Sequence, residues 1–295
     1  MKVNELLIDD PRFPENLKEI PDPPSCLYFV GNLELFERRR VAIVGTRKST
    51  PYGESFAHQF AKELSQAGIC VVSGLAYGID AIAHQGALKG EGGTIAVLAQ
   101  ALPEIRPVRH KRLAETIVEK GGLLISEQAK EEPFNRTDYL VRNRLISGLS
   151  EGVLVVEAAY RSGALNTANH ALDQNRYVMA VPGRINDEFS GGTNRLIHDG
   201  AALIRSTEDI ADFLNIKLKR KVNVELSGPQ KELYELLLKE PQNGAELGEK
   251  FHGKLSELYN LLAELEMNGL VKFSNSNRYV ACGGRGGSGA GSGSG

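Results

Sequence analysis

Short apolar segments rich in β-branched residues recur along the chain and alternate with longer amphipathic segments. The apolar segments span residues 41–45, 69–73, 94–98, 122–126, 152–156, 177–181 and 202–204. Patterns typical of helices occupy about 52–67, 79–89, 110–120, 138–149, 164–175, 193–199 and 207–214. Continuous apolar strands that alternate with helices indicate a parallel sheet covered on both faces. We therefore predict an α/β fold with a doubly wound, mostly parallel sheet.

The segments on either side of this region have other patterns. Residues 1–38 are rich in proline and charge, and we expect a surface lead-in with one short helix and a strand near 27–30. The α/β domain is expected over 39–215 and a basic linker over 216–226. Residues 227–282 show three short helical patterns and a hairpin, which predict a winged-helix domain. Residues 283–295 are a flexible Gly/Ser tail with the composition of an engineered linker.

Composition excludes several classes of protein. The 295 residues are 41% hydrophobic and 24% charged with a net charge of −2, so a nucleic-acid surface must be a local patch. Cys26, Cys70 and Cys282 have no metal-type or disulfide spacing, which favours a reducing cytoplasm. The N-terminal MKVNELLIDD lacks an apolar leader, and no apolar run is long enough for a bilayer. We expect no membrane association.

The sequence lacks the common enzyme motifs. It contains no G-x-G-x-x-G after the first strand, no phosphate-loop motif, no G-x-S-x-G and no zinc spacing. Residues 71–88 predict a strand, a glycine turn and a helix carrying Asp80 and His84. We interpret Asp80 as a cap or an ion-pair partner of an arginine, and His84 as a packing residue. Glu127 and Glu157 end strands close to arginines in sequence, which favours ion pairing over acid–base catalysis.

Arginines follow the predicted strand ends. They are Arg47, Arg106, Arg109, Arg136, Arg142, Arg144, Arg161, Arg184 and Arg195. Ligands of parallel sheets bind at this edge, and Tyr139 is available there to stack on a base. Cations that neutralise phosphates beside an aromatic ring describe a site for single-stranded nucleic acid.

The motifs resemble DNA processing protein A, the DprA/Smf family. The resemblance rests on segments that run in order along about residues 20–215. They are GTRKSTPYG (45–53), SGLAYGIDAIAHQGAL (73–88), GGLLISE (121–127), RNRLISGLS (142–150), VVEAAYRSGALNTA (155–168), and VPGRI with GGTNRLIHDGA (181–201). The turn 99–101 departs from the family pattern, because Ala-Gln-Ala replaces a glycine-flanked turn.

The resemblance implies an extended Rossmann-like domain that binds single-stranded DNA, loads the RecA recombinase in natural transformation or recombination, and forms a homodimer. It implies no turnover. We expect no cofactor and no catalytic or metal residue. By motif, Arg47, Arg136 and Tyr139 look like DNA contacts. The full set expected to bind DNA is Arg47, Lys48, Ser73, Gly74, Arg106, Arg109, Arg136, Tyr139, Arg142, Arg144, Ser162 and Gly163.

Two other functions remain open. One is a nucleotide N-glycoside hydrolase like the related LOG family, although 162–167 lacks that family's catalytic glutamate. The other is a sensor that binds a mononucleotide in the same groove. The predicted winged helix has six Lys or Arg and nine Asp or Glu over 222–282, so we expect it to contact protein or to regulate and not to read duplex DNA.

Overall fold

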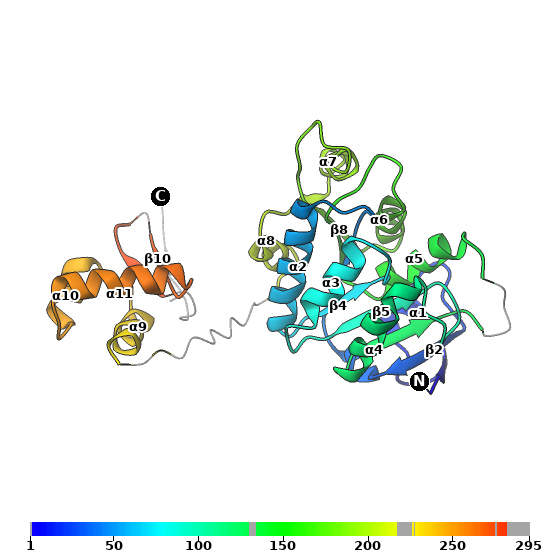
Figure 1. The fold of residues 1–295 in the computed structure, drawn as a ribbon, viewed down its shortest axis with the longest axis horizontal. Coiled ribbons are helices and arrows are strands. Elements are labelled where there is room, and N and C mark those ends of the chain that lie inside the picture. The colour runs from blue at the N-terminus through cyan, green and yellow to red at the C-terminus, as the bar shows by residue number, and fades with distance from the viewer. Residues whose placement is uncertain (1, 130–133, 217–225, 227, 275, 282–295) are drawn as a thin grey trace, which may run out of the picture. The chain divides into compact units, whose positions relative to one another are not determined.

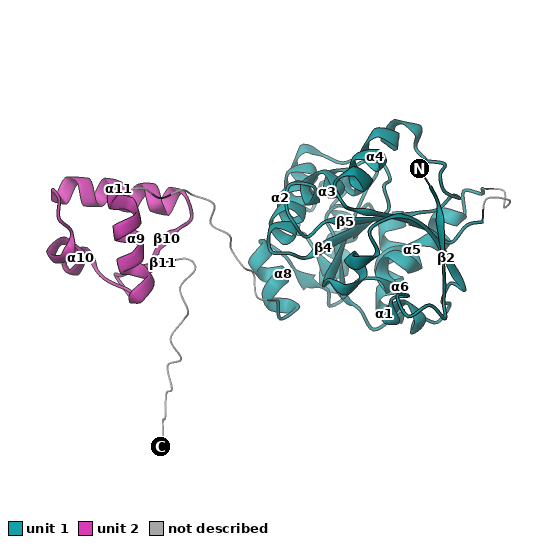
Figure 2. Ribbon diagram, turned by 90° about the horizontal axis from the view of Figure 1, so that it is seen from below, with its two compact units in different colours: residues 1–219 teal, residues 220–295 magenta. Residues whose placement is uncertain are grey.

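The computed structural model describes residues 2–129, 134–216, 226, 228–274 and 276–281. The chain divides into two compact units, residues 1–219 and 220–295, which Figure 2 shows in different colours. Most of the expected basic linker, including Lys217, Lys219, Arg220 and Lys221, lies outside the described residues, as does the Gly/Ser tail 283–295.

The first unit contains a nine-stranded sheet in the order β1-β2-β6-β5-β4-β3-β7-β8-β9. Its strands are β1 (Asn4–Leu7), β2 (Cys26–Gly31), β3 (Arg40–Val44), β4 (Cys70–Ser73), β5 (Thr94–Leu98), β6 (Leu123–Ser126), β7 (Gly152–Val155), β8 (Tyr177–Ala180) and β9 (Ala202–Leu203). Its helices are α1 (Glu15–Lys18), α2 (Pro51–Gln66), α3 (Ile79–Ala87), α4 (Lys111–Glu119), α5 (Asp138–Gly148), α6 (Gly163–Asp173), α7 (Gly191–His198) and α8 (Thr207–Phe213), with short 3-10 helices η1 (Leu33–Glu37) and η2 (Val108–His110). The strands from β3 to β9 pair in parallel, which confirms the predicted fold.

Helices cover both faces of this sheet (Figures 1 and 2). Neighbouring strand residues point to opposite faces, so Val41 and Ile43 pack under α2, α3 and α8, whereas Ala42 and Val44 pack under α1, α5 and α6. A third apolar cluster lies beneath α4. Burial of strand residues on both faces explains why these strands appear in the sequence as continuous apolar runs.

The lead-in belongs to the sheet, and its interpretation as a surface segment was wrong. β2 pairs antiparallel with β6, and β1 pairs antiparallel with β2. Phe13, Leu17 and Leu27 are buried in the core beneath α5. The expected short helix and the strand near 27–30 are present, but β1 was not expected, because only Leu6 of its four residues is buried.

The second unit consists of α9 (Pro229–Lys239), α10 (Gly244–Lys250), α11 (Leu255–Met267) and an antiparallel pair, β10 (Val271–Phe273) and β11 (Tyr279–Ala281). Its own apolar core includes Leu233, Leu247, Leu258 and Leu262. The three helices and the hairpin lie where the sequence predicts them, and the winged-helix assignment itself stays a prediction.

The described residues contain neither a candidate membrane span nor a cluster of potential metal ligands. None of their helices is long and apolar enough to cross a bilayer. Their His, Cys, Asp and Glu side chains form no group of three or more that could hold a metal ion.

Candidate nucleic-acid interface

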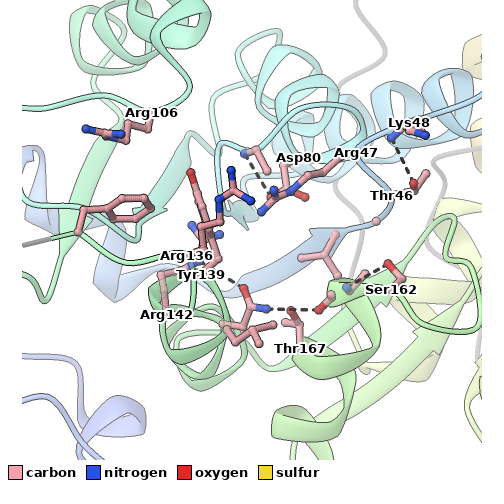
Figure 3. Close-up of a pocket in the computed structure, with 18 residues that line it drawn as sticks. Thr46, Arg47, Lys48, Asp80, Arg106, Arg136, Tyr139, Arg142, Ser162 and Thr167 are labelled. Carbon is pink, nitrogen blue, oxygen red and sulfur yellow. Dashed lines mark hydrogen bonds between the residues drawn. The ribbon is translucent and has the colours of Figure 1, made fainter.

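The sheet reverses its winding direction between β3 and β7. From β3 the chain adds β4, β5 and β6 on one side, and then β7, β8 and β9 on the other. In such sheets the crevice outside the carboxyl ends of the two central strands is the usual ligand site. A pocket of about 750 Å³ lies there (Figure 3). Its lining residues are Val44, Gly45, Thr46, Arg47, Lys48, Ala76, Asp80, Arg106, Phe134, Arg136, Tyr139, Leu140, Arg142, Asn143, Ser162, Gly163, Ala164 and Thr167.

The loop between β3 and α2 is held in place by Glu157. The backbone N–H of Thr46 donates to the Glu157 carbonyl oxygen at 2.7 Å. The Thr50 N–H and hydroxyl donate to the two carboxylate oxygens of Glu157 at 3.0 and 2.5 Å. Glu157 is 4% exposed, and its carboxylate lies against Gly53 of α2. The expected ion pair of Glu157 with an arginine was therefore wrong, because its carboxylate binds the start of α2.

Gly78 brings the start of α3 against the same loop. It has a φ of 72°, and a Cβ there would collide with the backbone of Thr46 and Arg47. The Ile79 N–H donates to the Thr46 carbonyl oxygen at 3.2 Å. Glycine is required at this position because it adopts a positive φ at little cost and leaves room for the neighbouring backbone. The loop that carries Arg47 and Lys48 is thus fixed from two sides.

The pocket is strongly cationic. Among the residues that the structure describes, the lining includes five cationic side chains and one carboxylate, Asp80. Arg47, Lys48, Arg106 and Arg136 are exposed, whereas Arg142 and Asp80 are buried. A concave surface with an excess of one charge concentrates its field on a ligand of opposite charge. The pocket therefore favours an anionic ligand.

Aromatic rings lie among these cations. The Arg47 guanidinium carbon is 4.6 Å from the ring centroid of Tyr139, and that of Arg106 is 5.1 Å from the centroid of Phe134. The Phe134 and Tyr139 rings meet edge to face, with centroids 5.3 Å apart. Phe134 was not expected here; the signal for it is an aromatic residue just before the predicted helix of Tyr139. A guanidinium group is attracted to the face of an aromatic ring. These contacts therefore place positive charge and aromatic surface side by side at the pocket wall.

Asp80 and Arg142 form the buried floor of the pocket. Asp80 accepts hydrogen bonds from the N–H groups of Gly74 and Ala76 at 3.1 and 3.4 Å. Arg142 donates to the carbonyl oxygens of Gly74, at 2.8 Å, and Val97. Burial raises the pKa of Asp80, while the charge of Arg142 opposes that shift. Burial also lowers the pKa of Arg142 to about 10, so this side chain stays cationic at neutral pH.

The N-terminus of α6 forms the opposite wall. Ser162 is the N-cap, and its hydroxyl oxygen accepts the Ala164 N–H at 3.3 Å. Asn143, a second lining residue that was not expected, donates to the Gly163 carbonyl oxygen at 3.3 Å and to Asn166 Oδ1 at 3.1 Å. Its position between Arg142 and Arg144 in the sequence could have indicated that Asn143 lies at the site. This amide ties α5 to α6 across the pocket, and the positive end of the α6 helix dipole favours anions.

The structure brings most of the predicted site residues together in this pocket. They are Arg47, Lys48, Arg106, Arg136, Tyr139, Arg142, Ser162 and Gly163. Gly74 lies beneath the pocket, where its N–H binds Asp80. Arg109 is exposed on η2, outside the lining.

The predicted roles of Ser73 and Arg144 in DNA binding were wrong. Ser73 is fully buried, and its hydroxyl donates to the Ile43 carbonyl oxygen at 2.7 Å, so it is closed to a ligand. Arg144 pairs with Glu127 at 2.7 Å and with Asp22 at 2.8 Å, and its side chain is 9% exposed. Its partners neutralise its charge inside the fold, which agrees with the ion pairing expected for Glu127.

His84 lies away from the pocket in the packing role expected of it. It is fully buried, and its Nδ1 is 2.7 Å from Thr94 Oγ1. The Thr94 hydroxyl donates to the Val71 carbonyl oxygen, so His84 Nδ1 is the donor to Thr94. Burial lowers the pKa of His84 to about 3. The imidazole is therefore neutral and linked to the strands.

Comparison with known proteins covers the first unit. Protein Smf of Escherichia coli is 43% identical over 210 residues, which are 71% of this chain and 56% of that protein. The chain thus spans little more than half the length of that relative. DNA processing protein DprA of Bacillus subtilis is 41% identical over 213 residues, covering 72% of this chain and 71% of that protein.

Solved structures agree with these relatives. DNA processing protein A from Streptococcus pneumoniae superposes with a TM-score of 0.68 at 38% identity, covering 72% of this chain and 74% of that one. The protein of that name from Helicobacter pylori, whose structure concerns its single-stranded DNA binding mode, gives a TM-score of 0.65 at 32% identity over 73% and 95%. The family model described as DNA recombination-mediator protein A matches residues 4–215. With the sheet, the pocket and these matches in agreement, the chain belongs to the DNA recombination-mediator protein A family.

Proposed function

We propose that the pocket at the β3–β7 switch binds single-stranded DNA without regard to sequence. The observation that carries the proposal is the excess of cationic side chains over carboxylates among the described lining residues, where Asp80 is the one carboxylate. Such cations neutralise phosphates of any sequence, and releasing counterions from the strand favours binding. The relative from Helicobacter pylori, described as binding single-stranded DNA, supports the same ligand class for this chain.

The aromatic residues favour a single strand over a duplex. The rings of Phe134 and Tyr139 stand at the pocket wall beside the arginines. Bases of a single strand are free to stack on such rings, whereas bases of a duplex are already stacked and paired. Cations for the backbone together with rings for the bases form a site for an unpaired strand.

The direct test compares single-stranded with duplex DNA of the same length by fluorescence anisotropy. We expect the single strand to bind more tightly, and the double variant Arg47→Ala/Arg136→Ala to lose most of that affinity. Lys120→Ala is the matched control: it removes an exposed cation just before β6, at the opposite edge of the sheet. Binding by the double variant as tight as that of the control would overturn the proposal.

We propose further that the bound strand is handed to the RecA recombinase in the cytoplasm during recombination or transformation, and that the protein acts as a homodimer. The family match supports this step. The test is the rate of RecA assembly on a single strand, with and without the protein. We expect acceleration that the Arg47→Ala/Arg136→Ala variant lacks. A mass measurement in solution tests the dimer, and a monomer at working concentrations would contradict it.

We propose binding without turnover. The carboxylate of Glu157, the residue whose substitution tests the hydrolase alternative, is occupied by Thr50. Release of free base from a nucleoside monophosphate, lost in Glu157→Gln, would revive that alternative. The pocket volume of about 750 Å³ also falls in the range of small-ligand sites, so the sensor alternative has support. Tight binding of a mononucleotide with no affinity for a single strand would favour it.

A further inference from the structure

A second cavity of about 380 Å³ lies beside the cationic pocket. It is bounded by the loop after β7 and by residues of α6 and α7, namely Tyr160, Ser162, Leu165, Asn166, Asn169, Gly192, Arg195, Leu196 and Asp199. Ser162 lines both cavities, so both reach the start of α6. The second cavity therefore lies within reach of a strand that extends from the first past Ser162.

Tyr160 gives the second cavity an accessible aromatic ring. The residue is 67% exposed. Its ring rests on Gly191, because a Cβ at that glycine would lie 2.5 Å from Tyr160 Cε2 and 3.0 Å from Cζ. The absence of a side chain at 191 therefore lets the ring lie against the start of α7. A ring supported on one side and open to solvent is suited to stacking on a base.

The charge of this cavity differs from that of its neighbour. Arg195 and Asp199 pair with each other at 3.4 Å, with side chains 64% and 54% exposed. The lining therefore has no excess of positive charge and does not select a phosphate. It offers two amides. Asn166 accepts from Asn143 through its oxygen, with no hydrogen bond from its amino group to another described residue, and Asn169 is exposed. Amides donate to and accept from the polar edges of bases.

We propose that the second cavity is a nucleobase subsite, which takes a base of the same strand whose phosphates lie in the cationic pocket. This inference rests on the proposed function. The strand passes Ser162 and Gly163, and a following base stacks on Tyr160 with its edge toward Asn166 and Asn169. The site then holds phosphate and base in separate compartments, so its footprint exceeds the cationic pocket.

The experiment measures affinity for oligothymidylates from about 4 to about 16 nucleotides long. Short oligomers fill the cationic pocket alone, and longer ones reach Tyr160. We expect Tyr160→Ala to weaken binding of the longest oligomers by between about 5-fold and about 150-fold and to leave the shortest unchanged. Tyr160→Phe keeps the ring and should retain wild-type affinity. Tyr177→Ala is the matched control, since it removes a similarly exposed ring at the amino end of β8.

Two further measurements separate stacking from other effects. An oligomer whose second half lacks bases should bind wild type and Tyr160→Ala equally. Asn169→Ala changes an exposed helix position and should show a smaller loss of affinity with the same length dependence. It replaces Tyr160→Ala as the test variant if circular dichroism shows that Tyr160→Ala is misfolded. Equal losses at every length, or no loss at any length, would overturn the subsite while leaving the proposed function standing. Failure of the wild-type protein to bind any oligomer would instead overturn both.

Discussion

At the residue scale, Arg142 and Arg144 show how position on a helix decides the role of a side chain. They are two residues apart on α5, and residues at that spacing do not share a face. Arg142 reaches the pocket, whereas Arg144 pairs with Glu127 and Asp22. Tyr139 is three residues before Arg142 and lies on the pocket side with it. Arg142 and Arg144 both follow a strand end in the sequence, so the sequence alone predicted DNA binding for both.

Asp80 and Arg142 should depend on each other for their contribution to stability. Both are buried, and Arg142 supplies the opposing charge that Asp80 senses. Removing either partner leaves the other buried without its opposite charge, so Asp80→Asn and Arg142→Met should each lower the free energy of unfolding by about 3 kcal/mol. Denaturant titration checks this, and the double variant should lose less than the two single losses combined. Strict additivity would contradict the coupling.

His84 should make stability depend on pH. Its pKa is lowered to about 3 in the fold from an ordinary value of 6.5, so below pH 6.5 the unfolded chain binds a proton that the native chain excludes. Stability contributed by His84 is therefore present above pH 6.5 and lost as the pH falls toward 3. Relative to His84→Asn, wild type should lose about 1.4 kcal/mol per pH unit within that window. Parallel pH profiles of the two proteins would contradict this assignment.

At the element scale, the alternation of apolar runs and amphipathic segments predicted the strands and helices of residues 40–214 to within two residues. It succeeded because β3 to β8 are buried on both faces and appear as unbroken apolar runs. The same pattern did not predict β1, because three of its four residues are exposed and only Leu6 is buried. The loop before α5 carries Phe134, which no periodicity marks. Edge strands and loops are set by contacts from distant segments, which local pattern does not contain.

The start of α2 should be sensitive to a single methyl group. A Cβ on Gly53 would overlap the carboxylate of Glu157, which binds Thr50. Gly53→Ala should lower the free energy of unfolding by about 1–3 kcal/mol and weaken single-strand binding, because the loop carrying Arg47 loses its anchor. The control is Gly248→Ala in α10, where a Cβ would meet Leu255 only at 3.4 Å. An unfolding transition of the first unit that Gly53→Ala leaves unchanged would refute the role given to Glu157.

At the scale of the whole molecule, the chain combines two units with separate apolar cores. The family match and the cationic pocket both belong to the first. Sequence reasoning located that pocket because parallel strands bring their carboxyl ends to one edge, so side chains distant in sequence converge. It could not distinguish the lining residues from Ser73, whose hydroxyl serves a neighbouring strand. Which side chains face the pocket depends on packing in three dimensions.

Separate cores should give separate unfolding. The described core residues of the second unit pack among α9, α10, α11 and the β10–β11 hairpin. Calorimetry should therefore resolve two transitions, and Leu258→Ala should shift only the one that belongs to the second unit. One cooperative transition that Leu258→Ala shifts as a whole would contradict the independence of the units.

The most direct test of the central claim is the salt dependence of single-strand binding. Each phosphate contact contributes about 0.7 to the slope of log affinity against log salt concentration. If Arg47 and Arg136 each contact a phosphate, Arg47→Ala/Arg136→Ala should reduce that slope by about 1.4 and weaken binding at every salt concentration, whereas Lys120→Ala should leave both unchanged. A double variant that keeps the wild-type slope and affinity would show that the cationic pocket is not where the strand binds.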